Sequence, residues 1–245
     1  MPLPIARDLV LRAIRIAEKA HRTRSQGPHH RKVPDGQDRP YYLVHLAEVS
    51  WMLSDAGADD ELIAAGWIHD VLEDCGYTAN QLEQEIGNKR VTTLVRWVSE
   101  TGNAPLPEGE KEPWEIRNTR YLKRMLDAPV DALDLSCADK TANIMEMCTW
   151  LDQGYLIEEF TSRDHGTQLA KFEALDRIYR SKVTERIYLR FSEWLEVFRA
   201  LAAGSRDKER EHLLDIRTFK EKSRKLGEAM ARNLNYNVMQ DNPGK

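Results

Sequence analysis

Apolar residues recur at helical spacing along most of the chain, and alternating runs of β-branched residues are scarce. The stripe formed by Ile5, Leu9, Ala13, Ile16 and Ala20 predicts a first helix over about residues 5–25. The same spacing predicts further helices over about residues 42–56, 60–74, 78–87, 88–101, 114–126, 130–152, 166–180, 182–202 and 206–233. The sequence therefore predicts an all-α protein.

Local residue choices support the helix expected at residues 78–87. The hydroxyl of Thr78 can cap the first turn while Gln81, three residues later, reaches back to the start of the helix. Gly87 can then end the helix in the left-handed conformation.

The clearest internal boundary lies at Gly204-Ser205. It predicts one domain over residues 1–203 and a C-terminal helical segment over residues 204–245. From Ser205 onward the segment carries ten Lys or Arg against seven Asp or Glu, with a partial apolar face. We interpret it as a solvated helix that docks on the core or forms a dimer contact, so a homo-oligomer stays open.

Composition narrows the class of protein. Lys and Arg number 36 and Asp and Glu number 40, for a net charge of −4, which is not typical of a general nucleic-acid-coating protein. No apolar run approaches the roughly 18–20 residues of a membrane span. The N-terminus lacks the basic and apolar regions of a secretory signal. Three cysteines without metal spacing fit a reducing compartment. We expect a cytoplasmic protein that binds neither nucleic acid nor membrane.

The richest chemistry lies in the segment from Trp67 to Asp74. On one continuous helix, Glu73 lies a turn beyond His69 and Asp74 a turn beyond Asp70. An imidazole beside a carboxylate offers two metal ligands. A second carboxylate pair about one turn, or roughly 5–6 Å, away leaves room for a water molecule. A His-Asp pair alone is a weak signal, so its meaning depends on the rest of the chain.

Two other segments carry residues of the same kind. His45 follows Pro40-Tyr41-Tyr42 at the start of an apolar helix, where a structural role is the plain alternative. Asp139 and Asn143 stand four residues apart in a stretch of small and apolar residues. A buried carboxylate needs a partner, so Asp139 predicts a metal ligand, a salt bridge or a cap.

Together these three segments resemble the HD-domain metal phosphohydrolases. Within that group the chain is most similar to the hydrolase domain of the RelA/SpoT family and to its free-standing small alarmone hydrolases, over about residues 8–150. The resemblance implies an HD-domain helical bundle with an additional C-terminal segment. It also implies four metal ligands, His45, His69, Asp70 and Asp139. Glu73 and Asp74 match the acidic pair that orients and deprotonates the attacking water.

The resemblance also implies a nucleotide pocket. Asn143 matches an asparagine near the substrate ribose or phosphate, and Arg31-Lys32 matches a segment that lines the pocket. From Arg22 to Arg39 there are five Lys or Arg and two Asp, a local positive patch that would attract a highly phosphorylated nucleotide. This loop is longer than the family pattern, and Met145 stands where the family often has a phosphate-binding arginine. Further candidate phosphate or base contacts are Lys111, Arg117, Tyr121, Lys123 and Arg124, with Arg117 and Tyr121 one helical turn apart.

The implied activity is metal-dependent removal of the 3′-pyrophosphate from guanosine tetra- or pentaphosphate, (p)ppGpp, giving GDP or GTP and pyrophosphate. Imidazole and carboxylate ligands suit Mn²⁺, Fe²⁺ or Zn²⁺, and the resemblance favours Mn²⁺. A chain of this length has no room for synthetase and regulatory domains, so we expect it to degrade the nucleotide and not make it. Two alternatives stay open: hydrolysis of another nucleotide, such as (p)ppApp or NADPH, and a regulatory binder without turnover.

Overall fold

The structure is a computed structural model that describes residues 5–24, 27–100 and 112–202. Within this part the chain forms ten α-helices and one 3-10 helix. No strand occurs among the described residues, where the only β-pairing is an isolated bridge between His30 and Tyr41. The predicted all-α class is confirmed. The elements in order are α1 (Ile5–Arg22), α2 (Leu43–Asp55), α3 (Asp60–Ile68), α4 (Val71–Asp74), α5 (Ala79–Ile86), α6 (Lys89–Val98), α7 (Trp114–Leu126), α8 (Val130–Asp152), η1 (Ile157–Glu159), α9 (His165–Tyr179) and α10 (Glu185–Ala202).

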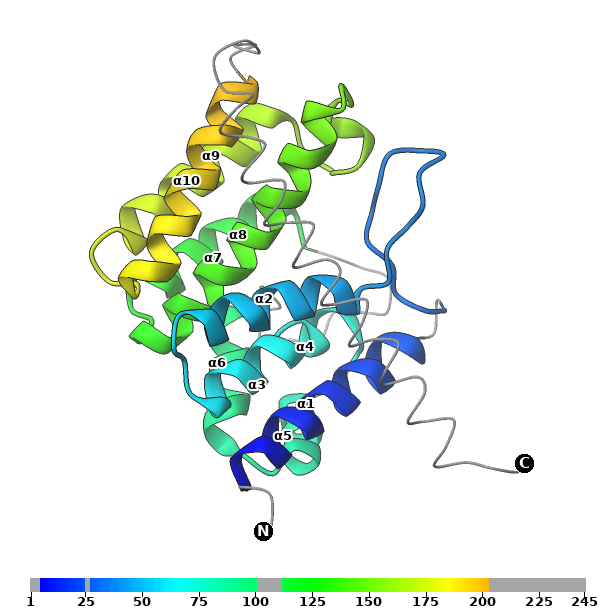
Figure 1. Cartoon of the computed structure of the whole chain (residues 1–245), viewed down its shortest axis with the longest axis vertical. Coiled ribbons are helices and arrows are strands. Elements are labelled where there is room, and N and C mark those ends of the chain that lie inside the picture. The colour runs from blue at the N-terminus through cyan, green and yellow to red at the C-terminus, as the bar shows by residue number, and fades with distance from the viewer. Residues whose placement is uncertain (1–4, 25–26, 101–111, 203–245) are drawn as a thin grey trace.

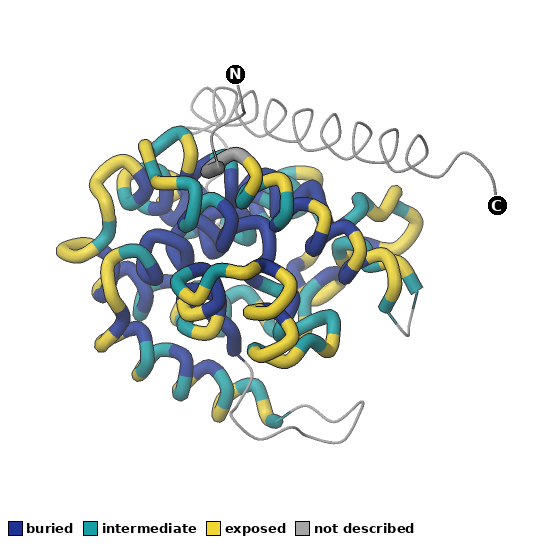
Figure 2. Tube along the Cα trace, turned by 90° about the horizontal axis from the view of Figure 1, so that it is seen from below, coloured by how far each residue is buried: buried dark blue, intermediate teal, exposed yellow. Residues whose placement is uncertain are grey.

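Helix α8 lies at the centre of the bundle. It packs against α2, α3, α6, α9 and α10, and Figure 1 shows α10 running alongside it. Its buried residues lie on all sides of the helix, as expected for an element enclosed by others. Figure 2 shows the buried segments gathered inside, with exposed segments in the loops and on the outer faces of the helices around them. This position lets α8 present polar side chains to helices from both ends of the described chain.

The predicted helix over residues 60–74 is wrong in one respect. The structure has two helices, α3 and α4, with His69 and Asp70 between them. The Nδ1 of His69 donates to the carbonyl oxygen of Gly66 at 2.8 Å, which in a continuous helix accepts from the Asp70 amide. The chain then restarts with the amides of Glu73 and Asp74 both donating to the Asp70 carbonyl.

Other predicted features are confirmed within a few residues. Thr78 and Gln81 form the expected capping box at α5, and Gly87 ends that helix at φ +64°. The sequence did not predict η1. The predicted helix at residues 206–233 lies outside the described residues, and the division at residues 203/204 stays a prediction. Within the described residues, no helix combines the length and apolar character needed to cross a bilayer.

Gly66 sets the approach of α3 to α2. A Cβ at this position would lie 2.8 Å from Ser50 Oγ and 3.2 Å from Ser50 Cα, and 3.0 Å from Leu53 Cδ1. Because Ser50 and Leu53 belong to α2, the missing side chain lets the two helices pack closely. His45 on α2 and His69 at the end of α3 are brought together by this contact.

Gly66→Ala should therefore lower the free energy of unfolding by about 1–3 kcal/mol, because an extra methyl group forces backbone shifts in a packed core. Urea unfolding followed by circular dichroism measures the change. Gly166→Ala is the control, since a Cβ there meets only the Asp164 carboxylate, at 3.3 Å. Equal stability of the Gly66 variant and the parent protein would show that the helices can separate without loss.

Candidate metal and active site

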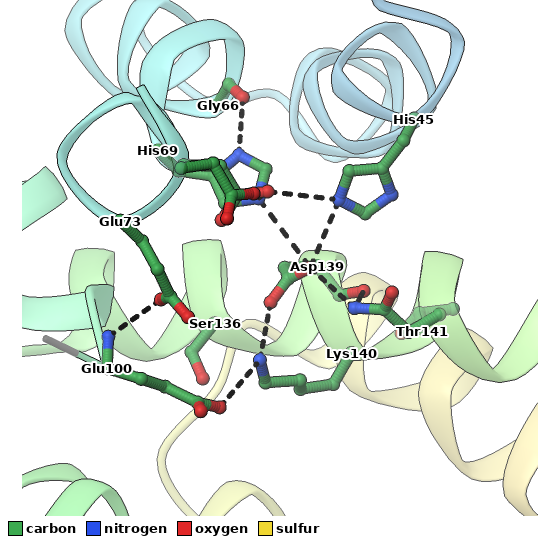
Figure 3. Close-up of polar contacts among 12 residues, drawn as sticks. His45, Gly66, His69, Glu73, Glu100, Ser136, Asp139, Lys140 and Thr141 are labelled. Carbon is green, nitrogen blue, oxygen red and sulfur yellow. Dashed lines mark hydrogen bonds and ion pairs between the residues drawn. The ribbon is translucent and has the colours of Figure 1, made fainter. Parts of the chain in front are cut away.

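Four side chains from three segments of the chain, His45, His69, Asp70 and Asp139, converge between α2, α3 and α8. Figure 3 shows His45, His69 and Asp139 pointing toward one another. The Nε2 of His69 lies 3.0 Å from Asp70 Oδ2 and 3.6 Å from Asp139 Oδ1. The Nε2 of His45 lies 3.6 Å from Asp70 Oδ2 and 3.3 Å from Asp139 Oδ1. One ligand atom from each of His45, His69 and Asp70 falls within 4.8 Å of the others. The structure thus brings together all four residues that the sequence nominated as metal ligands.

The hydrogen bond made by the His69 ring shows which of its nitrogens is open to a metal ion. Because its Nδ1 donates to the Gly66 carbonyl, the neutral ring carries only a lone pair at Nε2. That lone pair faces the carboxylate oxygens of Asp70 and Asp139, which are also acceptors. The Nε2 atoms of His69 and His45 are both buried without a hydrogen-bond partner. Acceptors that face one another in this way require a proton or a metal ion between them, and imidazole with carboxylate is a ligand set that divalent metals accept.

The pKa shifts point to the same conclusion. Burial acts to lower the pKa of His69, but the charges of Asp70 and Asp139 outweigh it and raise that pKa well above its usual value. Burial acts to raise the pKa of each carboxyl, yet His69 lowers that of Asp70, and Lys140 and the histidines lower that of Asp139. The two carboxylates therefore stabilise a positive charge at the His69 ring, whether a proton or a metal ion, whereas burial and the charge of Arg31 lower the pKa of His45.

An aromatic stack of Tyr42, His29 and His21 supports the Asp70 carboxylate. The hydroxyl of Tyr42 donates to Asp70 Oδ2 at 2.6 Å. The Tyr42 ring stacks on His29 with centroids 3.8 Å apart and on His21 at 4.7 Å. His21 is fully buried, with its Nδ1 2.9 Å from the Nδ1 of His29. The stacking holds the Tyr42 ring in place, so its hydroxyl fixes the Oδ2 atom of Asp70, a candidate metal ligand.

Tyr42→Phe should weaken divalent-metal binding about tenfold, because the ring stack stays while the hydrogen bond to Asp70 is lost. Calorimetric titration with Mn²⁺ gives the affinity. Tyr41→Phe is a matched control, since the Tyr41 hydroxyl makes only a 3.5 Å contact with the Glu18 carbonyl. If both variants bind Mn²⁺ like the parent protein, the Tyr42 hydroxyl does not orient Asp70.

Glu73 lies beside this cluster on α4 and is held from two directions. Its Oε2 accepts from the main-chain amide of Glu100 at 3.0 Å, and its Oε1 lies 3.8 Å from Arg117 Nη1. Burial and the charges of Glu100, Asp74 and Asp70 raise the pKa of Glu73 to about 7. A carboxyl with this pKa can exchange a proton near neutral pH. Its neighbour Asp74 lies 4.0 Å from His29 Nδ1.

Arg31 and Asn143 are joined to the candidate metal ligands. The Nδ2 of Asn143 donates to Asp139 Oδ1 at 2.7 Å, and its Oδ1 accepts from Arg31 at 2.8 Å. Arg31 also pairs with Glu146 and lies over the Tyr42 ring at 5.3 Å. The side chain of Met145 is buried, in agreement with its exclusion as a phosphate contact.

Three other candidate substrate contacts, Lys32, Arg117 and Tyr121, differ in burial and in the residues they contact. Lys32 is exposed and lines a cavity of about 360 Å³ between residues 32–39 and 159–162. Arg117 faces Glu73 and Glu100. Tyr121 is fully buried, and its hydroxyl bonds to Ser136 at 2.5 Å, so its ring belongs to the core beneath the site.

Sequence reasoning missed three charged residues in contact with the site. Glu100, Lys140 and Lys171 are all largely buried, with 10–11% of each side chain exposed. Lys171 does carry a signal, because it shares a helical stripe with the buried Leu175 and Ile178. Lysine rarely lies on an apolar stripe, and when it is buried there it needs a partner of opposite charge.

Comparison with known families identifies the fold. The family model for the HD domain matches residues 13–153, which is more than half of the chain and includes all four convergent residues. The chain belongs to the HD-domain family. Membership implies a divalent metal, in agreement with the His and Asp cluster. The match ends just after α8, so α9 and α10 lie outside the matched part.

Curated relatives of this HD domain are large. A guanosine-3′,5′-bis(diphosphate) 3′-pyrophosphohydrolase of Aquifex aeolicus is 31% identical over 114 residues, or 46% of this chain and 15% of that protein. The protein of the same name from Haemophilus influenzae is 27% identical over 103 residues, or 42% of this chain and 15% of its own length. The matched segments thus span less than a sixth of these relatives.

A solved structure extends the comparison of the fold. A metazoan ortholog of SpoT, described as hydrolysing ppGpp, superposes with a TM-score of 0.59 at 21% identity. The match covers 78% of this chain and 94% of the ortholog. The shared fold therefore extends beyond the residues that match the family model.

Proposed function

We propose that this HD domain hydrolyses the 3′-pyrophosphate of guanosine tetra- and pentaphosphate, yielding GDP or GTP and pyrophosphate. The observation that carries the proposal is the pair of unpartnered histidine nitrogens facing two carboxylates, next to a glutamate whose pKa is raised to about 7. The names of the relatives and their matched segments support the choice of substrate.

His45, His69, Asp70 and Asp139 would hold the divalent ion in this proposal. Two imidazoles and two carboxylates suit Mn²⁺, with Fe²⁺ and Zn²⁺ as the competing ions. When bound, the ion supplies positive charge that stabilises the charge developing on the phosphoryl group. Tyr42 and Asn143 keep the two carboxylates in place through their hydrogen bonds to Asp70 and Asp139.

Glu73 would act as the general base. Its carboxylate takes a proton from water as the water oxygen bonds to the phosphorus attached to the ribose 3′-oxygen. The bond from that phosphorus to the 3′-oxygen breaks, the 3′-oxygen takes up a proton from solvent, and Glu73 returns its proton to solvent. Asp74 would orient the same water, and Arg31 with Asn143 would bind the substrate phosphates or ribose. Lys32 would contact the nucleotide from the cavity that it lines.

The test uses metal-free protein, ppGpp and added Mn²⁺, with GDP and pyrophosphate measured separately. We expect both products in equal amounts, and neither product without a divalent ion. ppApp and NADPH are assayed in parallel, with GTP as a nucleotide that lacks the 3′-pyrophosphate. Faster turnover of ppApp or NADPH would move the substrate to those nucleotides. Tight nucleotide binding without product under any divalent ion would indicate a regulatory binder and contradict the proposal.

We also propose that the protein works in the cytoplasm. The support is that Cys75, Cys137 and Cys148, all within the described part of the chain, form no disulfide, and two of them are buried. Cysteines that form no disulfide suit a reducing compartment.

A further inference from the structure

A cluster of four charged residues joins the candidate base to a candidate metal ligand. We call Glu100, Arg117, Lys140 and Lys171 the Glu100 cluster. Glu100 lies just after α6, Arg117 is on α7, Lys140 is on α8 and Lys171 is on α9. Four separate segments of the chain therefore supply one cluster, with Lys140 lying between Glu100 and Asp139 (Figure 3).

Glu100 is the centre of this cluster. Its Oε1 accepts from Lys171 Nζ at 2.9 Å and lies 3.7 Å from Lys140 Nζ. Its Oε2 accepts from Arg117 Nη1 at 3.3 Å. Its main-chain amide donates to Glu73 Oε2 at 3.0 Å. Glu100 therefore has three cations on its side chain and the candidate base on its backbone.

Lys140 continues the cluster to the metal site. Its Nζ lies 2.7 Å from Asp139 Oδ2, on the carboxylate whose Oδ1 faces both histidines. The ring of Tyr121 lies under the two lysines, with Lys140 Nζ at 5.0 Å and Lys171 Nζ at 5.8 Å from its centroid. Both ammonium groups are thus fixed by a carboxylate and an aromatic face, which restricts their positions.

We propose that Lys171 and Glu100 are positioning residues for the hydrolysis. Lys171 holds the Glu100 carboxylate, and Glu100 in turn fixes the Glu73 carboxylate through its amide and through Arg117. This inference rests on the function proposed above. It assigns part of the active-site architecture to α9, which lies beyond the residues matched by the HD-domain family model.

The charge balance around Glu100 explains why Lys171 would affect the position of Glu73. Glu100 and Glu73 are like charges in contact through one amide, so without cations they repel each other. Lys171 neutralises Glu100 at Oε1, and Arg117 contacts both carboxylates, 3.3 Å from Glu100 Oε2 and 3.8 Å from Glu73 Oε1. Removal of Lys171 leaves Glu100 with less compensation, so its carboxylate and its amide are free to move. A shift of about 1 Å in a reacting group can lower turnover by about 10²-fold.

The experiment compares Lys171→Met with Lys171→Arg, and with Lys89→Met as a matched control on an exposed lysine of α6. We expect Lys171→Met to lower kcat for ppGpp by roughly ten- to hundredfold, with KM and Mn²⁺ affinity within about twofold of the parent protein. Lys171→Arg keeps the charge and should recover most of the loss, whereas Lys89→Met should change nothing. A rise in KM without a fall in kcat would identify Lys171 as a direct substrate contact and overturn the positioning role.

The pH profile separates positioning from general destabilisation. Charged groups that face Glu73 are Asp70 and Asp74 from its own segment, Glu100, and Arg117 and Arg124 from α7. Lys171→Met leaves the Glu100 charge less compensated, so the acid limb of kcat should move to higher pH. Glu100→Gln removes that charge while keeping the amide, so the limb should move to lower pH. Shifts in the same direction, or none, would overturn the inference.

A direct titration keeps this inference distinct from the proposed function. The Glu73 carboxyl carbon, assigned with a Glu73→Gln sample, is followed by NMR in the parent protein and in both cluster variants. If the parent protein releases no pyrophosphate, the proposed function fails, but opposite shifts of this resonance still support the link from Lys171 to Glu73. If turnover is present and the resonance titrates alike in all samples, the positioning role alone is wrong.

Discussion

Replacing Asp70 with alanine should abolish divalent-metal binding and pyrophosphate release together. Asp70 Oδ2 is the carboxylate oxygen nearest to a histidine nitrogen, 3.0 Å from His69 Nε2, and it also lies 3.6 Å from His45 Nε2. Loss of an outer-shell partner weakens a metal site by about 10- to 100-fold, so loss of a direct ligand should exceed that range. Metal content after dialysis and GDP formation from ppGpp measure the two effects on one sample.

Asp8→Ala is the control for this variant, because Asp8 is an exposed aspartate on α1 with 68% of its side chain accessible. Both variants should keep the helical signal in circular dichroism, since Asp70 lies at the edge of the core with 17% of its side chain exposed. An Asp70→Ala protein that retains Mn²⁺ at parent affinity would remove Asp70 from the ligand set. Retained metal with lost turnover would instead assign Asp70 to the chemistry.

The ligand set illustrates what the sequence can supply. His45, His69, Asp70 and Asp139 were nominated from three short segments in the right order, and the structure brings them within contact distance. Periodicity predicts the helices that carry or flank these residues, because apolar stripes are a strong local signal. Neither the three segments nor the periodicity predicts the distance between α2 and α3, which depends on the close contact at Gly66.

The break between α3 and α4 shows where local reasoning stops. The run from Trp67 to Asp74 has helical spacing throughout, so its pattern gives no sign of an interruption. At the break, the His69 ring donates a hydrogen bond to the Gly66 carbonyl in place of the Asp70 amide. Which of the two donors bonds to this carbonyl depends on the orientation of the His69 ring, which the local sequence does not specify.

The Glu100 cluster escaped prediction for a related reason. Glu100 and Lys171 are 71 residues apart and belong to no motif, and each is of a type that usually lies on the surface. Only the tertiary packing of α9 against α7 and α8 turns them into a buried pair. The apolar stripe beside Lys171 was the single local sign that this lysine points inward.

Glu73→Gln should keep Mn²⁺ binding near the parent value and lower kcat by about 10²-fold or more, because glutamine cannot accept the proton of the attacking water. The amide of Glu100 donates at 3.0 Å to the oxygen that glutamine retains, so the side chain should keep its place. Stopped assays of GDP formation and calorimetry with Mn²⁺ separate turnover from metal binding. Glu83→Gln, on the exposed face of α5, is the control.

The pH dependence gives this variant a second test, whose sign follows from the role of a base. Glu73 works when deprotonated, so kcat of the parent protein should rise with pH through the pKa of this carboxyl. Burial and the charges of Glu100, Asp74 and Asp70 raise that pKa to about 7 in the protein without metal. A divalent ion nearby favours the charged form and lowers the pKa, so the acid limb of the loaded enzyme should lie at or below pH 7. Glu73→Gln should lack this limb, and a variant with parent turnover and an unchanged limb would assign water activation to another group, with Asp74 the nearest carboxylate in sequence.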